Sequence, residues 1–451
     1  MGRTSGTALP ANARQSLEKL VAARLGANVA EPEIAPASRY DALTDFTTLP
    51  GYREVRLQRA AAETLGIGNP FFRVHDERAG STTRIDGRSF DNFSSYDYLG
   101  LNGHPSVSTA AKAAVDRYGT SPSASRVVAG ERPVHGELER ALAAHYGQDS
   151  CAVFVSGHAT NVNAIGSLMG PRDLIVHDAL AHNSILTGAT LSRAERRSFA
   201  HNDIDALDTL LTQLRPQFQR VLIVVEGLYS MDGDCPDLPA LVALKKRHGA
   251  WLMVDEAHGL GVLGPTGAGL HEHAGVDPRE VDIWMGTLSK TLASCGGYIA
   301  GCSALVEFLK CTSGGFIYSV GMAPAMAAAA TAALAALHAE PERVGRLRDN
   351  GALFCSLARE HGLDTGSTLG LAVVPVIVYD SLVAVTLSQR LFERGINVQP
   401  IIHPAVPERT SRLRFFITAD HQPDQIRRTV EAVAEELARV GNTKAILQRL
   451  S

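Results

Sequence analysis

The chain has 451 residues, of which 45% are hydrophobic and 20% are charged, and its formal net charge is −4. This length suits one large domain with a smaller one beside it. The slightly acidic balance provides no basic field for a phosphate backbone, so we expect no nucleic-acid partner.

The cysteines and the longest apolar run both favour a cytoplasmic protein. The six cysteines form no C-x-x-C motif and no paired spacing, which is typical of a reduced compartment. Residues 323–339 are mostly alanine with Pro324 near the start, so they predict a buried helix rather than a membrane span. No apolar core of a secretory signal stands at the N-terminus, and we expect no integral membrane segment.

The first hundred residues differ in composition from the rest. Residues 12–26 have the apolar spacing of an amphipathic helix, and an Ala/Pro-rich linker follows them. Residues 49–66 predict a second amphipathic helix, and 81–95 predict a hairpin around an Asp-Gly turn. We therefore expect a helix and linker over 1–45 and a helix and hairpin segment over 46–104.

From about residue 105 the sequence alternates between helical periodicity and short apolar runs. The predicted helices are 105–118, 133–147, 159–169, 182–192, 204–214 and 237–248. The predicted strands are 151–156, 173–178, 221–227, 251–257, 282–288 and 296–301, with two later ones at 372–379 and 411–418. Continuous apolar strands are typical of a parallel α/β sheet buried on both faces. This pattern predicts a large α/β domain over 105–325 and a smaller α+β domain over 326–451.

Polar residues follow several of these strands, at the sheet edge where ligands bind in α/β folds. They are Ser156, Gly157, His158, His182, Ser230, Asp255, His258, Thr287, Ser289 and Lys290. The set combines small and hydroxyl residues suited to a phosphate with imidazoles, a carboxylate and an amine. It predicts one ligand site at the carboxyl ends of the strands.

Residues 255–264 contain two familiar motifs in succession, DEAH and G-x-G-x-x-G. A DEAH ATPase needs a P-loop, and the nearest string, residues 286–291, lacks the glycine before the lysine. A dinucleotide fingerprint needs glycines directly after a strand, whereas here the DEAH residues intervene and Pro265 breaks any helix. We interpret these glycines as a flexible loop and Glu256 as structural.

Asp255 and Lys290 together suggest pyridoxal phosphate. A lysine can form a Schiff base with the cofactor, and a strand-end aspartate can keep its pyridinium nitrogen protonated. A lone lysine is ordinarily a solvated amine, but Lys290 follows an apolar strand and lies among small hydroxyl residues in GTLSKT. His271 and His273 have no matching cluster of ligands, so we expect no metal site.

At this point the chain resembles a known family, the α-oxoamine synthases. These are fold-type I pyridoxal-phosphate acyltransferases that include 8-amino-7-oxononanoate synthase, 5-aminolevulinate synthase and serine palmitoyltransferase. The resemblance covers about residues 70–440. It is carried in order by NFSSYDYLGL, ASRVVAGERPVHGELERALAAHYG, FVSGHATNVNAI, HDALAHNSI, VVEGLYSMDGD, MVDEAHGLGVLGPTGAG, GTLSKTLASCGGYIAG and HPAVPERTSRLRFFITADH. It implies a mainly parallel, seven-stranded sheet domain with a small C-terminal domain, and a homodimer with its site at the interface.

The resemblance also implies catalytic roles. Lys290 would carry the cofactor and later remove the α-proton of the substrate, and Asp255 would pair with the pyridinium nitrogen. His182 would stack on the cofactor ring. His258 and Ser230 would hydrogen-bond its phenolic oxygen, and His258 would also polarise the thioester carbonyl.

Binding roles follow from the same resemblance. Gly157, His158, Thr287 and Ser289 would surround the phosphate. Arg414 matches the arginine that binds the amino-acid carboxylate, a task that suits a bidentate guanidinium.

Several positions depart from the biotin- and haem-pathway members of the family. Tyr96 stands in place of a frequent Asn, His158 in place of an aromatic residue, and Val320-Gly321 in place of Thr/Ser-Ser. The missing hydroxyl at 320–321 removes a possible contact to the neighbouring subunit's phosphate. Ser125 falls where glycine-specific members carry Thr, so we expect Tyr96 and Ser125 to help bind an amino acid larger than glycine.

The implied reaction is a decarboxylative condensation of an α-amino acid with an acyl thioester, which gives an α-aminoketone, CO₂ and a free thiol. Residues 46–76 resemble the segment that precedes synthase domains following an acyl-carrier domain, so we favour a thioester on acyl carrier protein over acyl-CoA. The alternatives are another pyridoxal-phosphate reaction (an aminotransferase or a retro-aldol lyase), a serine palmitoyltransferase proper that uses acyl-CoA, and a catalytically silent partner subunit. The presence of Lys290 argues against the silent subunit.

Overall fold

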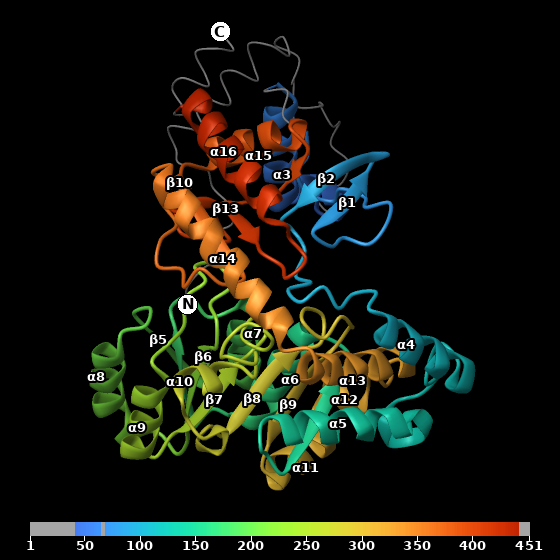
Figure 1. Ribbon diagram of the computed structural model, residues 1–451. Coiled ribbons are helices and arrows are strands. Elements are labelled where there is room, and N and C mark those ends of the chain that lie inside the picture. The colour runs from blue at the N-terminus through green and yellow to red at the C-terminus, as the bar shows by residue number, and fades with distance from the viewer. Residues whose placement is uncertain (1–40, 65–67, 442–451) are drawn as a thin grey trace.

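The structure is a computed structural model that describes residues 41–64 and 68–441. A seven-stranded sheet with the order β3-β9-β8-β7-β6-β4-β5 forms the centre of the large domain (Figure 1). Its strands are β3 Ser150–Phe154, β4 Leu174–Asp178, β5 Glu195–Phe199, β6 Val221–Glu226, β7 Trp251–Asp255, β8 Ile283–Thr287 and β9 Gly297–Gly301. All run parallel except β9, which is antiparallel to both of its neighbours. The mainly parallel sheet is therefore confirmed, and the predicted helix over 12–26 lies outside the described residues.

Alternate residues of each central strand point into cores on opposite faces of the sheet. In β6, Val221, Ile223 and Val225 belong to one hydrophobic cluster, while Leu222 and Val224 belong to the other. Every residue of β6 is buried. This two-sided burial explains why the strands appear in the sequence as continuous apolar runs.

Helices cover both faces of this sheet. The described helices of the large domain are α4 Pro105–Tyr118, α5 Pro133–His145, α6 Gly157–Leu168, α7 Asn183–Ser192, α8 Ile204–Leu214, α9 Leu238–His248, α10 Leu270–Ala274, α11 Ser303–Thr312, α12 Gly314–Ile317 and α13 Pro324–Ala339. Proline at the first position starts α4, α5 and α13, where its missing N–H costs nothing. Side chains of Ser156, Asp203 and Asp237 cap α6, α8 and α9.

The alanine-rich helix α13 lies against α4 and α5 and is largely buried, as its composition predicts. Because α13 packs on the large domain, the packing places the end of that domain nearer Ala339 than the predicted residue 325. None of the helices in the described part of the chain is long and apolar enough to cross a bilayer.

A smaller domain sits above the carboxyl ends of the large sheet, and α14 runs from one domain into the other (Figure 1). Its antiparallel sheet has the order β10-β13-β12, and a second sheet has the order β1-β2-β11. The elements are β1 Thr82–Ile85, β2 Arg88–Asn92, α14 Glu342–Glu360, β10 Val373–Tyr379, α15 Ser381–Glu393, β11 Ile396–Asn397, β12 Gln399–Ile401, β13 Ser411–Phe416 and α16 Pro423–Val440. The short N-terminal helices are α2 Asp41–Thr44 and α3 Pro50–Thr64.

The predicted hairpin is confirmed as β1 and β2, which pair antiparallel around Asp86 and Gly87. Both turn residues have positive φ, as a two-residue hairpin turn that matches the strand twist requires. β2 also pairs with β11 of the C-terminal half, so this N-terminal hairpin becomes part of the small domain.

Candidate active site

Lys290 lies just beyond β8, and its side chain is half-buried beneath the small domain. Its Nζ is 5.7 Å from the ring centroid of Tyr96. Burial lowers the pKa of Lys290 to about 8, although Asp255 and Glu226 act in the opposite direction. An amine with this pKa has a substantial neutral fraction near neutral pH, which is the form that attacks an aldehyde or accepts a proton.

Asp255 ends β7 and is held by two hydrogen bonds. Asn161 Nδ2 donates to its Oδ2 at 2.8 Å, and the backbone N of Ala257 donates to its Oδ1 at 3.0 Å. The side chain is only 4% exposed, so a carboxylate here is available to a cationic partner inside the protein and not to solvent. Asn161 lies one helical turn into α6, and its role was not predicted from the sequence.

His182 connects to the same network through Ser184. Asn161 Nδ2 donates to Ser184 Oγ at 2.9 Å, and His182 Nδ1 lies 2.7 Å from that oxygen. The backbone N of Ser184 also donates to His182 Nδ1, so this nitrogen accepts and Nε2 carries the ring proton. Burial lowers the pKa of His182 against the pull of Asp255, which keeps the imidazole neutral.

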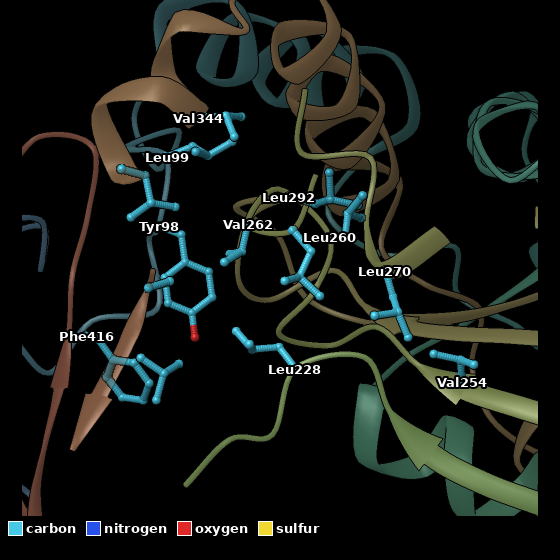
Figure 2. Packing of buried hydrophobic residues seen from close by; sticks show 14 of the residues in the cluster. Tyr98, Leu99, Leu228, Val254, Leu260, Val262, Leu270, Leu292, Val344 and Phe416 are labelled. Atoms are coloured by element: carbon cyan, nitrogen blue, oxygen red, sulfur yellow. The ribbon is translucent and has the colours of Figure 1, made fainter. Parts of the chain in front are cut away.

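His258 is buried, and its Nδ1 lies 2.6 Å from the hydroxyl of Tyr98. Burial, followed by the nearby Lys290 and Arg414, holds the pKa of His258 well below its usual range. Figure 2 shows the Tyr98 hydroxyl directed toward the space between Leu228 and Phe416. Tyr98 therefore fixes a neutral imidazole in place, a role that the sequence analysis did not assign.

A phosphate-sized cradle forms where α6 begins. Gly157 is the first residue of α6, and a Cβ placed on it would lie 2.7 Å from Thr287 Oγ1. Thr287 Oγ1 is 2.8 Å from Ser289 Oγ, so two hydroxyls face the helix N-terminus. Free backbone N–H groups, a helix dipole and hydroxyls suit an anion. The ring of His158 lies next to this helix end, 6.3 Å from that of His182.

Arg414 on β13 has donors without acceptors. Its Nη1 donates to the carbonyl of Ser230 at 2.9 Å, while its buried Nε has no partner among the described residues. Among the described residues no carboxylate forms an ion pair with Arg414. Burial lowers the pKa of its guanidinium. A half-buried guanidinium that has no counter-ion and whose Nε is fully buried without an acceptor is expensive, which indicates a site for an anionic ligand.

Ser230 follows β6 and is tied to a buried acid that the sequence analysis also missed. The backbone N of Ser230 donates to Glu226 Oε2 at 3.3 Å. Glu226 pairs in register with Asp255, and its Oε1 has no partner among the described residues. Burial, together with the charge of Asp255, raises the pKa of Glu226 to about 8.

Tyr96 belongs to the cluster, whereas Ser125 has no direct link to it. The Tyr96 ring lies edge-on to Phe416 at 4.8 Å and to His258 at 6.4 Å, and it is 41% exposed. In the described part of the chain, no hydrogen bond joins Ser125 to Lys290. The carbonyl of Ser125 instead accepts from Gly130 N at 2.9 Å, closing the π-helical turn Arg126–Gly130.

Three glycines enclose Glu256, and two of them follow the DEAH motif. A Cβ on Gly259 would lie 1.8 Å from Glu256 Oε2, and one on Gly227 or Gly269 would also contact the carboxyl group. Glu256 Oε1 accepts from the backbone N of Leu270 at 2.7 Å. The prediction that Glu256 is structural agrees with this packing. The prediction of a flexible loop is wrong, because most residues from 259 to 269 are buried.

The arrangement fits pyridoxal phosphate at three points. An amine is available for its aldehyde, a buried carboxylate for its pyridine nitrogen, and a helix N-terminus with two hydroxyls for its phosphate. The residues needed come from the carboxyl ends of β3, β7 and β8, which lie at one edge of the sheet.

Comparisons with known proteins agree with this geometry. A family model described as aminotransferase class I and II matches residues 90–433. An 8-amino-7-oxononanoate synthase of Geobacter sulfurreducens is 42% identical over 371 residues, which cover 82% of this chain and 93% of that protein. A serine palmitoyltransferase variant from S. paucimobilis with a bound PLP–myriocin aldimine superimposes with a TM-score of 0.84 at 30% identity, covering 88% of this chain and 99% of that chain.

A second serine palmitoyltransferase, from Sphingomonas wittichii, has a TM-score of 0.83 at 32% identity and covers 88% of this chain and 99% of that one. Sequence and fold thus point to the same group of enzymes. The chain belongs to the α-oxoamine synthase family, whose members are pyridoxal-phosphate-dependent acyltransferases that condense an amino acid with an acyl thioester.

Proposed function

We propose that the enzyme joins the α-carbon of an amino acid to the acyl group of a thioester and releases CO₂ and a free thiol, leaving an α-aminoketone. The observation that carries the proposal is the proximity of a low-pKa amine, Lys290, to the guanidinium of Arg414, which has no counter-ion among the described residues and whose buried Nε has no acceptor there. An amino acid presents the groups that such a pair recognises, because its carboxylate suits the guanidinium and its Cα–H suits a neutral amine.

Five residues would hold the cofactor ring. Lys290 would attach to its aldehyde, Asp255 would pair with the pyridine nitrogen, and His182 would lie against the ring face. Ser230 and His258 would hydrogen-bond the phenolic oxygen. The bound cofactor supplies an electron sink for the electrons released at the α-carbon. The bonds from Asn161 and Ala257 support this arrangement because they leave Asp255 little freedom.

The phosphate would lie at the start of α6, with Gly157, His158, Thr287 and Ser289 around it. The close approach of Gly157 to Thr287 supports this placement, since any side chain at 157 would fill the space. Val320 and Gly321 carry no hydroxyl that could reach the phosphate of the neighbouring subunit, so we expect these four residues of the same chain to provide most of the phosphate contacts.

Two neutral side chains would act on the substrates, one as a base and one as a hydrogen-bond donor. Lys290, once released from the cofactor, would take the α-proton at Nζ, and its lowered pKa supports this role. The neutral imidazole of His258 would donate from Nε2 to the thioester carbonyl oxygen, because Nδ1 is engaged by Tyr98. Loss of the carboxylate as CO₂ from the condensed product completes the reaction.

The partner subunit would complete the site. Val128 and Tyr318 are 81% and 88% exposed, and the backbone bond from Gly321 to Ala124 ties their two segments together. An exposed apolar patch of this kind supports a homodimer. We propose that Ser125, beside this patch, faces the neighbouring subunit's substrate and leaves room for an amino acid larger than glycine. A strong change of the cofactor absorption with glycine alone would overturn that preference.

We further propose that the acyl group arrives on acyl carrier protein, on the resemblance of residues 46–76 to segments that follow a carrier domain. The experiment compares the same acyl chain presented on carrier protein and on CoA. We expect a higher kcat/KM with the carrier, and equal values would refute the preference. Product masses separate the main reaction from its competitors, because an aminotransferase yields an oxo acid and a retro-aldol lyase yields an aldehyde.

A further inference from the structure

An imidazole lies between two carboxylates next to the site, and none of the roles above uses it. His201 follows β5, and its Nδ1 donates to Asp178 Oδ1 at 2.9 Å while its Nε2 donates to Asp234 Oδ2 at 3.0 Å. The nearest partner of each nitrogen is a carboxylate oxygen, while Asn202 Nδ2 lies farther from Nε2 at 3.4 Å, so both nitrogens carry protons and the ring is an imidazolium. Burial opposes the charge, but the hydrogen bonds to Asp178 and Asp234 outweigh it and raise the pKa of His201 to about 10.

The hydrogen bonds from His201 form a bridge between Asp178 and Asp234, and its Asp178 end is fixed in the large domain. Asp178 ends β4 and is fully buried. Besides His201, it accepts hydrogen bonds from the backbone N of Leu180 at 2.8 Å and of Asn202 at 2.9 Å. Burial acts against its charge, yet these bonds from His201, Asn202 and Leu180 lower the pKa of Asp178 overall. The Asp178 carboxylate is therefore a rigid anchor.

The other side of the bridge is the loop that carries Ser230. We call residues 229–234 the serine loop. Its ends are joined by the bonds from Tyr229 N to Asp234 O and from Gly233 N to Tyr229 O, both 2.9 Å. The Tyr229 ring stands edge-on to His201, with ring centroids 4.5 Å apart. His201 thus contacts this loop through a carboxylate and an aromatic ring.

The small domain rests on the same loop. The bonds that it makes are Ser367 Oγ to Asp234 Oδ2, Leu369 N to Gly233 O, Arg412 Nη1 to Met231 O and Asp232 Oδ1, and Arg414 Nη1 to Ser230 O. Gly233 has φ +73, and a Cβ there would lie 2.1 Å from Val373 O. The serine loop is therefore one of the surfaces on which the two domains meet.

We propose that His201 is a positioning residue that locks the serine loop to β4 and thereby sets where Ser230 and Arg414 meet the cofactor and the amino acid. The proposal rests on the proposed function of those two residues. Without the imidazolium, Asp178 and Asp234 face each other as uncompensated carboxylates, so Asp234 moves away and takes the loop with it.

The test uses the full chain with cofactor bound and compares H201Q with H248Q. His248 is the matched control, because its Nε2 also pairs with a carboxylate, that of Asp208 at 2.6 Å, but between α8 and α9 on the outer side of the large domain. Hydrogen exchange is measured by mass spectrometry over residues 229–234 and 367–370. The dissociation constant of the amino acid is measured from the cofactor absorption, and KM and kcat are measured with thioester present.

We expect H201Q to speed exchange in both segments by about tenfold or more and to raise the amino-acid dissociation constant and KM by about tenfold, with kcat within about threefold of wild type. H248Q should change neither the exchange in these two segments nor the binding of the amino acid. D234A is a second variant that keeps the imidazole but removes the acceptor through which it holds the loop, and it should behave like H201Q. Unchanged exchange in the serine loop, or faster exchange with unchanged amino-acid binding, overturns the proposal.

The same experiment separates this proposal from the proposed function. If wild type responds to no amino acid and forms no condensed product, the function is wrong, and the exchange data still decide whether His201 locks the loop. If wild type is active and H201Q affects only its melting temperature, as a general packing residue would, the positioning role is wrong.

Discussion

Arg414 has the surroundings of a residue that waits for an anion. It is half-buried, its buried Nε has no partner among the described residues, and its Nη1 is oriented by the carbonyl of Ser230. Such a guanidinium gains two charge-assisted hydrogen bonds when a carboxylate binds, whereas a backbone carbonyl offers it much less.

Replacing Arg414 with alanine should therefore raise the amino-acid KM by about 100-fold, which corresponds to roughly 2.7 kcal/mol. The KM of R414K should lie between those of wild type and R414A, because lysine retains the charge but not the planar guanidinium. Steady-state kinetics over a range of amino-acid concentrations checks this. R428A, which removes an exposed ion pair with Asp91, is the control, and an R414A enzyme with the KM of R428A would contradict the assignment.

The lowered pKa of Lys290 predicts how the cofactor-free enzyme captures pyridoxal phosphate. The neutral amine attacks the aldehyde, so the rate of capture should rise about tenfold per pH unit below pH 8 and level off above it. Stopped-flow absorption of the cofactor between pH 6 and about 10 follows this rate. A rate that still climbs tenfold per unit at the top of this range would indicate a lysine with its ordinary pKa.

The strand-end residues of the site could be predicted because the carboxyl ends of parallel strands lie at one edge of the sheet. Lys290, Asp255 and His258 were found in this way. Asn161 and Tyr98 were not, because their hydrogen bonds to Asp255 and His258 join residues far apart in sequence and depend on how α6 and the small domain pack. Residue type alone gives no signal for such partners.

At the scale of elements, the loop after β7 is a shell of glycines around a buried carboxyl group. Gly227, Gly259 and Gly269 approach Glu256 from different segments, and Glu256 Oε1 accepts a hydrogen bond from Leu270 N. The glycines are needed because no side chain fits between the backbone and the carboxyl group. Of the G-x-G-x-x-G glycines, Gly259 has this role, whereas Gly261 and Gly264 have positive φ and lie against Thr291 and Glu272. Packing thus accounts for the motif without any nucleotide.

Gly259→Ala should lower the free energy of unfolding by about 1–3 kcal/mol, since its Cβ would lie 1.8 Å from Glu256 Oε2. Gly345 in α14 is the matched control, because a Cβ there meets nothing within 4 Å. G345A should stabilise the protein by up to about 1 kcal/mol through helix propensity. Urea unfolding measures the free energy of unfolding of both variants. If G259A and G345A were equally stable, the loop would be able to accommodate the added methyl group.

Two strands show what the sequence pattern does and does not reveal. β5 was missed because its sequence ERRSF is charged and three of its residues are exposed, as suits an edge strand. The direction of β9 was not predicted, but it follows from chain length. Residues 288–296 are too few for a parallel crossover, so β9 has to return antiparallel to β8.

At the scale of the whole molecule, the serine loop joins the two domains, and His201 contributes to that joint. The pKa of His201 is raised in the folded chain, from an ordinary 6.5 to about 10. Its contribution to stability is therefore complete below pH 6.5 and is lost as the pH rises toward about 10. The neighbouring groups that titrate or carry charge are Asp178, Asp234 and Tyr229.

Wild type should consequently exceed H201Q in unfolding free energy by an amount on the order of 1–3 kcal/mol at pH 6, and this difference should shrink as the pH rises toward 10. Denaturant unfolding of both proteins across this range measures it. A difference that stays constant with pH would mean that the imidazole acts through packing and not through its charge.

The central claim is that this chain forms a carbon–carbon bond by decarboxylative condensation at Lys290. The most direct measurement incubates the enzyme, pyridoxal phosphate, a carboxyl-labelled amino acid and an acyl thioester, and counts CO₂ and free thiol. We predict equal amounts of both from wild type, matched by the α-aminoketone, and none from K290A. Thiol release without CO₂, CO₂ release without thiol, or undiminished turnover by K290A would contradict the account.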